Sequence, residues 1–234
     1  MKKEQQIIII LGAPSAGKGT QAELLAEKFD FFHLETSKII VKNLAGIKKD
    51  DFVEVNGKKY SLFEEKNRRD SGILMSPPLI TFWIKNKLKE FKKQGKSVIM
   101  AGSPRTLYEG EELIPFLKEL YGTENIQVIF IELSEKDSIW RSQRRKTCEL
   151  MRHTILYNDE TTKLTKCPFD GSKLVARKDD KPEVIKIRLK QYEERTFPLI
   201  EFFKKQDLEV KKINGAPAPV IVFENILKVL KWFQ

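Results

Sequence analysis

One short stretch near the start of the chain has the residue types and the spacing that bind polyphosphates. It reads Gly12-Ala-Pro-Ser-Ala-Gly-Lys-Gly-Thr20 and directly follows the apolar run 7–11. The next residues, 21–29, are helix formers with an apolar face, so the glycines occupy a strand-to-helix turn where unpaired backbone N–H groups converge. We expect Lys18 to reach the outer phosphates of a nucleoside triphosphate and the Thr20 hydroxyl to lie near its metal ion. A plain glycine turn with a surface lysine would not explain why strand, spacing, lysine and helix occur together.

The arginines form a second pattern. The chain has 43 Lys and Arg against 33 Asp and Glu, a formal net charge of +10. Lysines are scattered along expected helices, whereas arginines concentrate at 141–152 and recur at 177 and 188. The fixed fork of a guanidinium group suits phosphate, so this clustering indicates a phosphorylated small substrate and a lysine-rich solvated surface. Nucleic-acid binding is not expected, because no motif interleaves aromatic and basic residues.

The elements that must position these residues alternate along the chain. Apolar runs predict strands at 7–11, 97–100, 127–133 and 209–213. Helical spacing predicts helices at 80–94, 109–120 and 181–205. With 234 residues, 41% of them hydrophobic, the chain can bury a substantial core. The alternation predicts an α/β fold with a three-layer parallel sheet, whose ligands bind at the carboxyl ends of the strands.

Two segments interrupt the alternation. Residues 35–75 contain Asn56-Gly57 between alternating stretches, a strong hairpin signal, and residues 144–180 contain both cysteines of the chain. Two cysteines do not suggest a disulfide framework, and no run is long enough for a signal peptide or a membrane span. We therefore expect a cytoplasmic protein that has no membrane partner.

In their order along the chain, the motifs resemble those of the adenylate kinase family over nearly the whole length. They are the loop continuing into Gln21, then Gly102-Ser-Pro-Arg-Thr106, Arg141-Ser-Gln-Arg-Arg145, Arg177-Lys-Asp-Asp180 and Arg188-Leu189. The Gly-Thr after Lys18 is specific, since most such loops have Ser or Thr directly after the lysine. The resemblance implies a P-loop core (1–34, 76–143 and 181–234), a nucleoside-monophosphate-binding insertion (35–75) and a lid (144–180). It also implies a monomer that uses Mg²⁺ and converts ATP and AMP into two ADP.

The resemblance further assigns roles to individual residues. The cations around the migrating phosphoryl group would be Lys18, Arg105, Arg141, Arg145, Arg177 and Arg188. ATP would contact Gly12, Pro14, Ser15, Ala16, Gly17, Lys18, Gly19, Thr20, Arg141, Arg145 and Pro217. AMP would contact Thr36, Ile73, Leu74, Met75, Gly102, Ser103, Pro104, Arg105, Glu109, Arg177 and Arg188. Because two polyanions must meet while charge spreads over the transferred group, converging cations are what this reaction needs.

The monophosphate side departs from the family pattern at an arginine. Val41 stands where the family has the arginine that holds the AMP phosphate. Replacement cations would have to come from Lys38, Lys42, Arg68 or Arg69. A lysine there supplies a point charge and not a fork.

Two further departures affect the metal and the base. Ala101 replaces the acidic residue that helps hold water around Mg²⁺, which leaves ATP, Thr20 and water to bind the ion. Glu109 replaces the glutamine that reads adenine, and an ionised carboxylate accepts hydrogen bonds but does not donate them. The alternatives to an adenylate kinase are therefore a kinase for another nucleoside monophosphate and a weakly catalytic nucleotide-binding switch of the same fold.

The lid resembles those of bacterial relatives that bind zinc through one Cys-x-x-Cys pair and a later Cys-x-x-Cys or Cys-x-x-Asp pair. Here the pairs are Cys148-x-x-Met151 and Cys167-x-x-Asp170, with His153 close to the first. A structural Zn²⁺ would take Cys148, His153, Cys167 and Asp170, because methionine is a poor zinc ligand. The alternative is a lid held by packing and hydrogen bonds, with both cysteines as small buried side chains.

Two features leave alternatives open. The hairpin at Asn56-Gly57 lengthens the insertion, and it either reshapes the acceptor pocket or decorates the surface. Asp179 and Asp180 precede an expected helix, where they either anchor the lid or reflect the preference for acidic residues at a helix N-terminus.

Overall fold

A five-stranded parallel sheet forms the centre of the computed structural model, which describes residues 4–151, 153–157, 159–177 and 180–230. The strand order is β10-β6-β1-β5-β2. The strands are β1 (Ile7–Gly12), β2 (Phe32–Glu35), β5 (Val98–Ala101), β6 (Ile126–Glu132) and β10 (Val210–Asn214). The sequence predicted all of them except β2, and the α/β class with a parallel sheet is confirmed.

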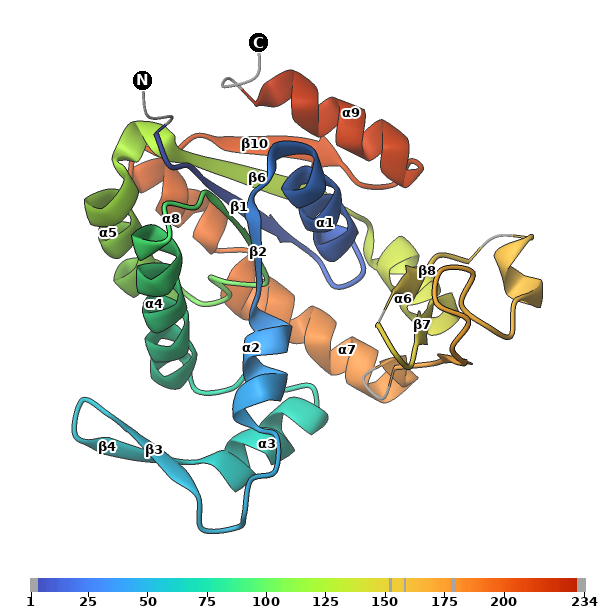
Figure 1. The fold of residues 1–234 in the computed structure, drawn as a ribbon, viewed down its shortest axis with the longest axis horizontal. Coiled ribbons are helices and arrows are strands. Elements are labelled where there is room, and N and C mark those ends of the chain that lie inside the picture. Colours follow the sequence, from blue (N-terminus) through green and yellow to red (C-terminus); the bar gives the residue numbers. More distant parts are fainter. Residues whose placement is uncertain (1–3, 152, 158, 178–179, 231–234) are drawn as a thin grey trace.

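Alternate residues of β1 divide the core into two layers. Ile7, Ile9 and Leu11 pack on one side of the sheet and Ile8 and Ile10 on the other, and all five are buried. Helices cover both faces, as Figure 1 shows, which gives the expected three layers. The first face is covered by α4 (Pro77–Lys93), α5 (Leu107–Tyr121) and α8 (Leu199–Lys205), the second by α1 (Lys18–Phe29) and α9 (Pro219–Val229).

The expected single helix over 181–205 is wrong. The chain forms α7 (Pro182–Gln191), one π-helical stretch (Tyr192–Thr196) and then α8. Pro198 lies at the junction and has no N–H to donate to the preceding turn, which favours an interruption of the helix there. After the interruption the two helices have different neighbours: α7 packs against α6, whereas α8 packs against α5 and β10.

Between β2 and α4 the chain builds a separate layer. It contains α2 (Thr36–Asn43), β3 (Phe52–Val55), β4 (Lys58–Ser61) and α3 (Leu62–Asp70). The antiparallel β3–β4 pair turns at Asn56 (φ 52°) and Gly57 (φ 77°), which confirms the predicted hairpin. The hairpin projects beyond the end of α4 (Figure 1).

The segment that carries both cysteines follows α6 (Glu135–Arg144). It forms a small antiparallel sheet of order β8-β7-β9, from β7 (Lys146–Cys148), β8 (Thr154–Ile155) and β9 (Leu174–Val175). We call residues 144–180 the lid segment. Short 3₁₀ turns occur at Thr123–Asn125 and Thr161–Lys163. None of the helices in the described part of the chain is both long and apolar enough to cross a membrane.

Candidate active site

The loop between β1 and α1 has the backbone shape that an anion site needs. Gly12 has φ 149°, and a Cβ built there would lie 2.4 Å from the carbonyl oxygen of Ile131, so only glycine fits. Ser15 (φ 59°) and Gly17 (φ 92°) adopt left-handed conformations, and Gly17 is the N-cap of α1 without a side-chain hydrogen bond. The first-turn N–H groups of α1 are therefore available to a ligand, and the helix dipole favours an anion there.

Lys18 is folded back into this loop. Its Nζ donates to the carbonyl oxygens of Gly12 (2.9 Å) and Ala13 (2.7 Å). Burial, and then the positive charges of Arg105, Arg188 and Arg145, hold the pKa of Lys18 well below its usual value. Cations gathered in this way repel one another, which is typical of a site whose ligand carries several negative charges.

Helix α6 is fastened to the loop by two serines one turn apart. The Ser138 hydroxyl donates to the carbonyl oxygen of Pro14 (2.6 Å), and the hydroxyls of Ser15 and Ser142 share a hydrogen bond of 2.6 Å. Ser138 and Ser142 are buried. The sequence reasoning missed both residues, although their i, i+4 spacing on a helix carrying the arginines is a usable signal.

Arg141 joins α6 to the loop that follows β10. Its Nη1 donates to the carbonyl oxygen of Gly215 (2.9 Å) and its Nη2 to that of Ala216 (2.8 Å). Pro217, which the sequence predicts to contact ATP, directly follows Gly215 and Ala216. The structure thus brings Arg141 and the 214–217 turn together at the same end of the sheet as the P-loop.

Arg145 makes a bidentate ion pair with a buried carboxylate. Its Nε and Nη2 donate to both carboxylate oxygens of Asp180, at 2.7 and 2.5 Å, and Arg188 lies 4.0 Å from the same carboxylate. The Asp180 side chain is 3% exposed. A bidentate pair at such a position fixes the guanidinium plane, and it links the start of the lid segment to the start of α7. Asp179 lies outside the described residues.

Arg177 is held within the small sheet of the lid segment. Its Nε donates to the Thr147 hydroxyl and its Nη2 to the Thr154 hydroxyl, both at 3.0 Å. The two threonines are opposite each other on β7 and β8. These two hydrogen bonds hold the Arg177 side chain on the small sheet.

Three of the residues that the sequence predicts for AMP, Thr36, Gly102 and Arg105, lie together. A Cβ built on Gly102 (φ 99°) would lie 3.0 Å from Arg105 Nη2 and 3.6 Å from Thr36 Oγ1. The Thr36 Oγ1 is buried and has no hydrogen-bond partner among the described residues. The Thr196 hydroxyl donates to the Arg105 carbonyl oxygen (2.8 Å) and positions this loop.

Glu109 is bound to its own loop. It is 3% exposed, and its Oε2 accepts hydrogen bonds from the Ser103 hydroxyl and from the Arg105 N–H (2.9 Å). Burial raises the pKa of the Glu109 carboxyl. Glu109 therefore shapes the loop after β5, in which Pro104 is also buried.

The 73–75 stretch is anchored by an arginine. Arg68 Nη2 donates to the Leu74 carbonyl oxygen (3.2 Å), while Met75 is buried and Ile73 is exposed. Two other cations that could replace the missing arginine at the AMP phosphate have acidic neighbours. Lys38 pairs with Glu35 at 3.2 Å, and Arg69 lies 3.8 Å from Asp70, the next residue in the sequence.

Four possible metal ligands converge in the lid segment. The ligand atoms of Cys148, His153, Cys167 and Asp170 all lie within 4.8 Å of one another. His153 Nδ1 is 3.6 Å from Cys148 Sγ, 3.4 Å from Cys167 Sγ and 3.3 Å from Asp170 Oδ2. The Met151 side chain is exposed and is not a member of the group.

Comparison with known proteins identifies the family. The adenylate kinase family model matches residues 10–208. The chain belongs to the adenylate kinase family. It is 34% identical over 229 residues to an adenylate kinase of Methanothrix thermoacetophila, covering 97% of this chain and 99% of that protein. Adenylate kinases of Mycoplasma capricolum (33% over 217 residues, 88% and 92%) and Clostridium perfringens (33% over 228 residues, 95% and 97%) are similar over most of both chains.

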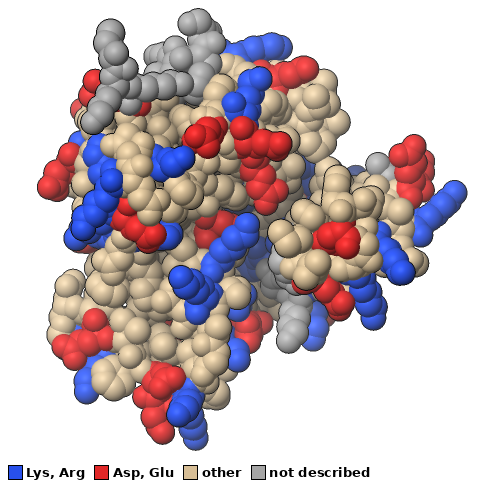
Figure 2. Space-filling model, viewed as in Figure 1, with Lys and Arg blue, Asp and Glu red and all other residues tan. Residues whose placement is uncertain are grey.

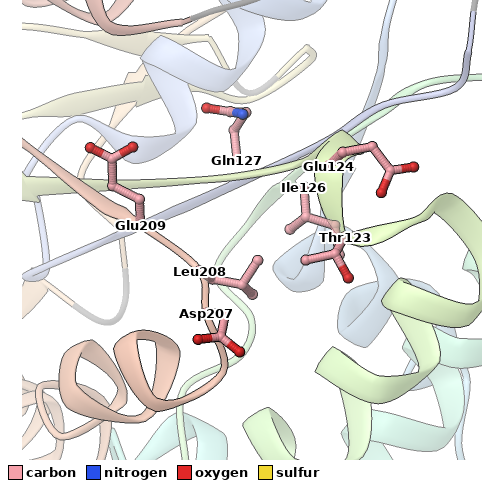
Figure 3. A pocket seen from close by; sticks show the side chains of 7 residues that line it. All are labelled: Thr123, Glu124, Ile126, Gln127, Asp207, Leu208 and Glu209. Atoms are coloured by element: carbon pink, nitrogen blue, oxygen red, sulfur yellow. The ribbon is translucent and has the colours of Figure 1, made fainter.

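Within this adenylate kinase fold, the space-filling view shows a recess between the larger body and the lid segment (Figure 2). Acidic and basic side chains alternate over the rest of that face. A second depression lies at the opposite, amino-terminal end of β6 and β10, away from the P-loop (Figure 3). Its lining is acidic, from Thr123, Glu124, Ile126, Gln127, Asp207, Leu208 and Glu209, so it does not suit a nucleotide.

Proposed function

We propose that the chain acts as an adenylate kinase and moves the terminal phosphoryl group of Mg-ATP to AMP, giving two ADP. The observation that carries the proposal is the P-loop of an adenylate kinase fold with Lys18 folded into it, together with the positive charges of Arg105, Arg145 and Arg188, which lie near enough to lower the pKa of Lys18. A protein that only binds nucleotide needs the P-loop but not cations from three further segments around it. The catalytically weakened switch and a different acceptor are therefore not favoured.

In the proposed reaction, a phosphate oxygen of AMP attacks the γ-phosphorus while the bond from that phosphorus to the β–γ bridging oxygen breaks. Charge spreads over the equatorial oxygens of the transferred group. The P-loop N–H groups and Lys18 hold the donor phosphates, and Arg105 holds the phosphate of AMP. Arg141, Arg145, Arg177 and Arg188 complete the cationic ring from α6, the lid segment and α7.

Two segments are proposed to close over the nucleotides, residues 35–75 on the acceptor side and the lid segment on the ATP side. The core is then formed by 1–34, 76–143 and 181–234. Arg177 travels with the lid sheet because two threonines hold it there, so closing the lid segment delivers a cation to the reacting group. Closure also excludes water, which would otherwise hydrolyse ATP.

Magnesium accompanies ATP in this family, and it neutralises charge on the phosphates when bound. Thr20 lies in the first turn of α1, directly beyond the loop, where its hydroxyl suits a hard cation. Ala101 at the end of β5 offers no ligand.

We propose a structural Zn²⁺ in the lid segment, bound by Cys148, His153, Cys167 and Asp170. Two thiolates, an imidazole and a carboxylate are suitable zinc ligands, and tetrahedral bonds of about 2.0–2.3 Å separate neighbouring ligand atoms by roughly 3.3–3.8 Å. The observed separations of 3.0 to 3.6 Å are close to that range. Metal analysis of the purified protein should give about one zinc ion per chain. The zinc should be lost in Cys148→Ser and retained in the control Met151→Ala, which changes an exposed residue. Wild-type protein without zinc would refute the site.

The reaction is tested by incubating the protein with Mg-ATP and, separately, AMP, GMP, CMP, UMP or dTMP, and resolving the nucleotides by ion exchange. We expect two ADP for each AMP consumed. Diphosphate formed only from another acceptor would show a different specificity. Measurable ATP binding without transfer to any acceptor would refute the kinase activity.

A further inference from the structure

The carboxyl end of β2 holds an acidic group where the neighbouring strand has none. In P-loop enzymes, the hydroxyl after the loop and an acidic residue at the end of a neighbouring strand together hold Mg²⁺. Here β5, next to β1, ends in Ala101. Strand β2 runs parallel to β5, and Glu35 is the direct register partner of Ala101.

Glu35 faces the same side of the sheet as the P-loop helix. His33 and Glu35 pair with Ile99 and Ala101, and these two residues belong to the core layer beneath α1. Because paired residues of parallel strands point to one face, His33 and Glu35 also face α1. There they meet Glu23, and the ligand atoms of these three side chains lie within 4.8 Å of one another.

Glu23 connects this group to the P-loop. It lies three residues after Thr20 on α1, so both side chains are on one face of the helix. Glu23 is exposed, and the partial burial of its carboxyl raises its pKa, with the neighbouring charge of Glu35 adding to the rise and Lys38 offsetting it in part. Nearby carboxyl groups of this kind are relieved by a cation.

The contacts of Glu35 leave it able to bind. Its carboxylate accepts a hydrogen bond from the Ser37 hydroxyl and pairs with Lys38, whose side chain is 65% exposed and free to swing into solvent. Burial opposes ionisation, but these two neighbours outweigh it and the pKa of Glu35 lies below its usual value. His33 Nε2 is buried without a hydrogen-bond partner in the described part of the chain, so it can bond to a water molecule.

We propose that Glu35 is the positioning carboxylate for the hydrated Mg²⁺ of Mg-ATP, and that it serves in place of an acidic residue at position 101. Mg²⁺ keeps several of its waters in such sites, and Glu35, with Glu23 and His33 beside it, accepts hydrogen bonds from them. The inference rests on the proposed kinase function, because it concerns the metal of that reaction.

The test is the affinity for ATP measured by calorimetry in excess Mg²⁺ and in excess chelator, together with the Mg²⁺ concentration that gives half-maximal ATP binding. In Glu35→Gln we expect that concentration to rise about 10–100-fold, the usual effect of removing a residue that orients a metal's ligands, with ATP binding in chelator unchanged. Moving the carboxylate back, in the double variant Glu35→Gln with Ala101→Asp, should restore the wild-type value. Glu54→Gln, an exposed glutamate of the hairpin, is the control.

A second variant, Lys38→Met, tests the same inference independently if Glu35→Gln fails to fold. Lys38→Met removes the exposed ammonium that competes for Glu35, so it should lower the required Mg²⁺ concentration. An unchanged requirement in Glu35→Gln, a failed rescue at position 101 or a raised requirement in Lys38→Met would overturn the inference. Wild-type protein that makes no ADP from Mg-ATP and AMP would instead refute the kinase function, so the two failures are distinguishable.

Discussion

The two sides of the cleft differ in what holds their polar groups. On the ATP side the protein supplies the partners itself, because Lys18 and Arg141 donate to backbone carbonyl oxygens and Arg145 is clamped by Asp180. On the acceptor side, Thr36 Oγ1 and Arg68 Nε are buried without a hydrogen-bond partner among the described residues; on α1, Gln21 Oε1 is also buried without one, although the Gln21 amide nitrogen donates to the Pro219 carbonyl oxygen. A buried polar atom without a partner costs about 1–3 kcal/mol.

This difference indicates two ways of preparing a site. The ATP side is organised in advance in the sense that protein groups already hold its cations: Lys18 and Arg141 on carbonyl oxygens and Arg145 on Asp180. The acceptor side leaves hydrogen bonds for its ligand to complete, which makes its order depend on the nucleotide. It is also the side where the sequence predicts departures from the family pattern, at Val41 and Glu109.

Lys18→Met should break the ATP side with the largest effect. We expect kcat to fall by about 10²–10³-fold, because a charge aimed at the transferring group is removed. The fold should survive, since the variant relieves the repulsion that lowers the Lys18 pKa. Steady-state ADP formation and thermal unfolding measure the two effects, with Lys28→Met on the same helix as the control. A near-normal kcat in Lys18→Met would refute the role of the loop.

Local patterns predicted much of this organisation. The P-loop, its strand and the Asn56-Gly57 hairpin follow from short-range signals, because turn geometry and buried parallel strands constrain residue types strongly. Strand β2 was missed, since its polar His33 and Glu35 lie at a sheet edge and conceal the apolar pattern. The contacts of Ser138 and the choice of Asp180 as the partner of Arg145 depend on tertiary packing, which periodicity does not record.

Asp180→Ala tests whether the advance organisation of the ATP side also stabilises the protein. The change leaves Arg145, only 12% exposed, without its counter-charge, so we expect a loss of about 3–5 kcal/mol in the free energy of unfolding. Urea unfolding followed by circular dichroism measures it. The control is Glu201→Ala, which removes an exposed ion pair with Lys204 and should cost no more than about 1 kcal/mol. Equal losses of unfolding free energy in both variants would mean that the buried Arg145–Asp180 pair stabilises the fold no more than an exposed ion pair does.

Glu109→Gln tests the acceptor side through the pH dependence of the free energy of unfolding. Burial raises the folded-state pKa of Glu109, so the folded state binds more protons than the unfolded state above about pH 4.3. The free energy of unfolding should therefore fall as pH rises from there through the raised pKa. Glutamine does not titrate, so urea unfolding at a series of pH values should show a smaller fall in Glu109→Gln. Glu112→Gln, on the same helix, should keep the wild-type dependence, and an identical dependence in Glu109→Gln would contradict the burial argument.

Gly57→Ala should give the smallest effect, because it changes only the hairpin of the acceptor side. Gly57 has φ 77°, a left-handed conformation that costs a residue with a Cβ about 1–2 kcal/mol. Val55 and Tyr60 of the hairpin pack into the main core, so this loss should appear in global urea unfolding. The KM for ATP should not change, since the hairpin lies outside the P-loop side. Lys58→Ala, at the exposed start of β4, is the control. If Gly57→Ala lost no more unfolding free energy than this control, the turn would not be needed to hold the acceptor side.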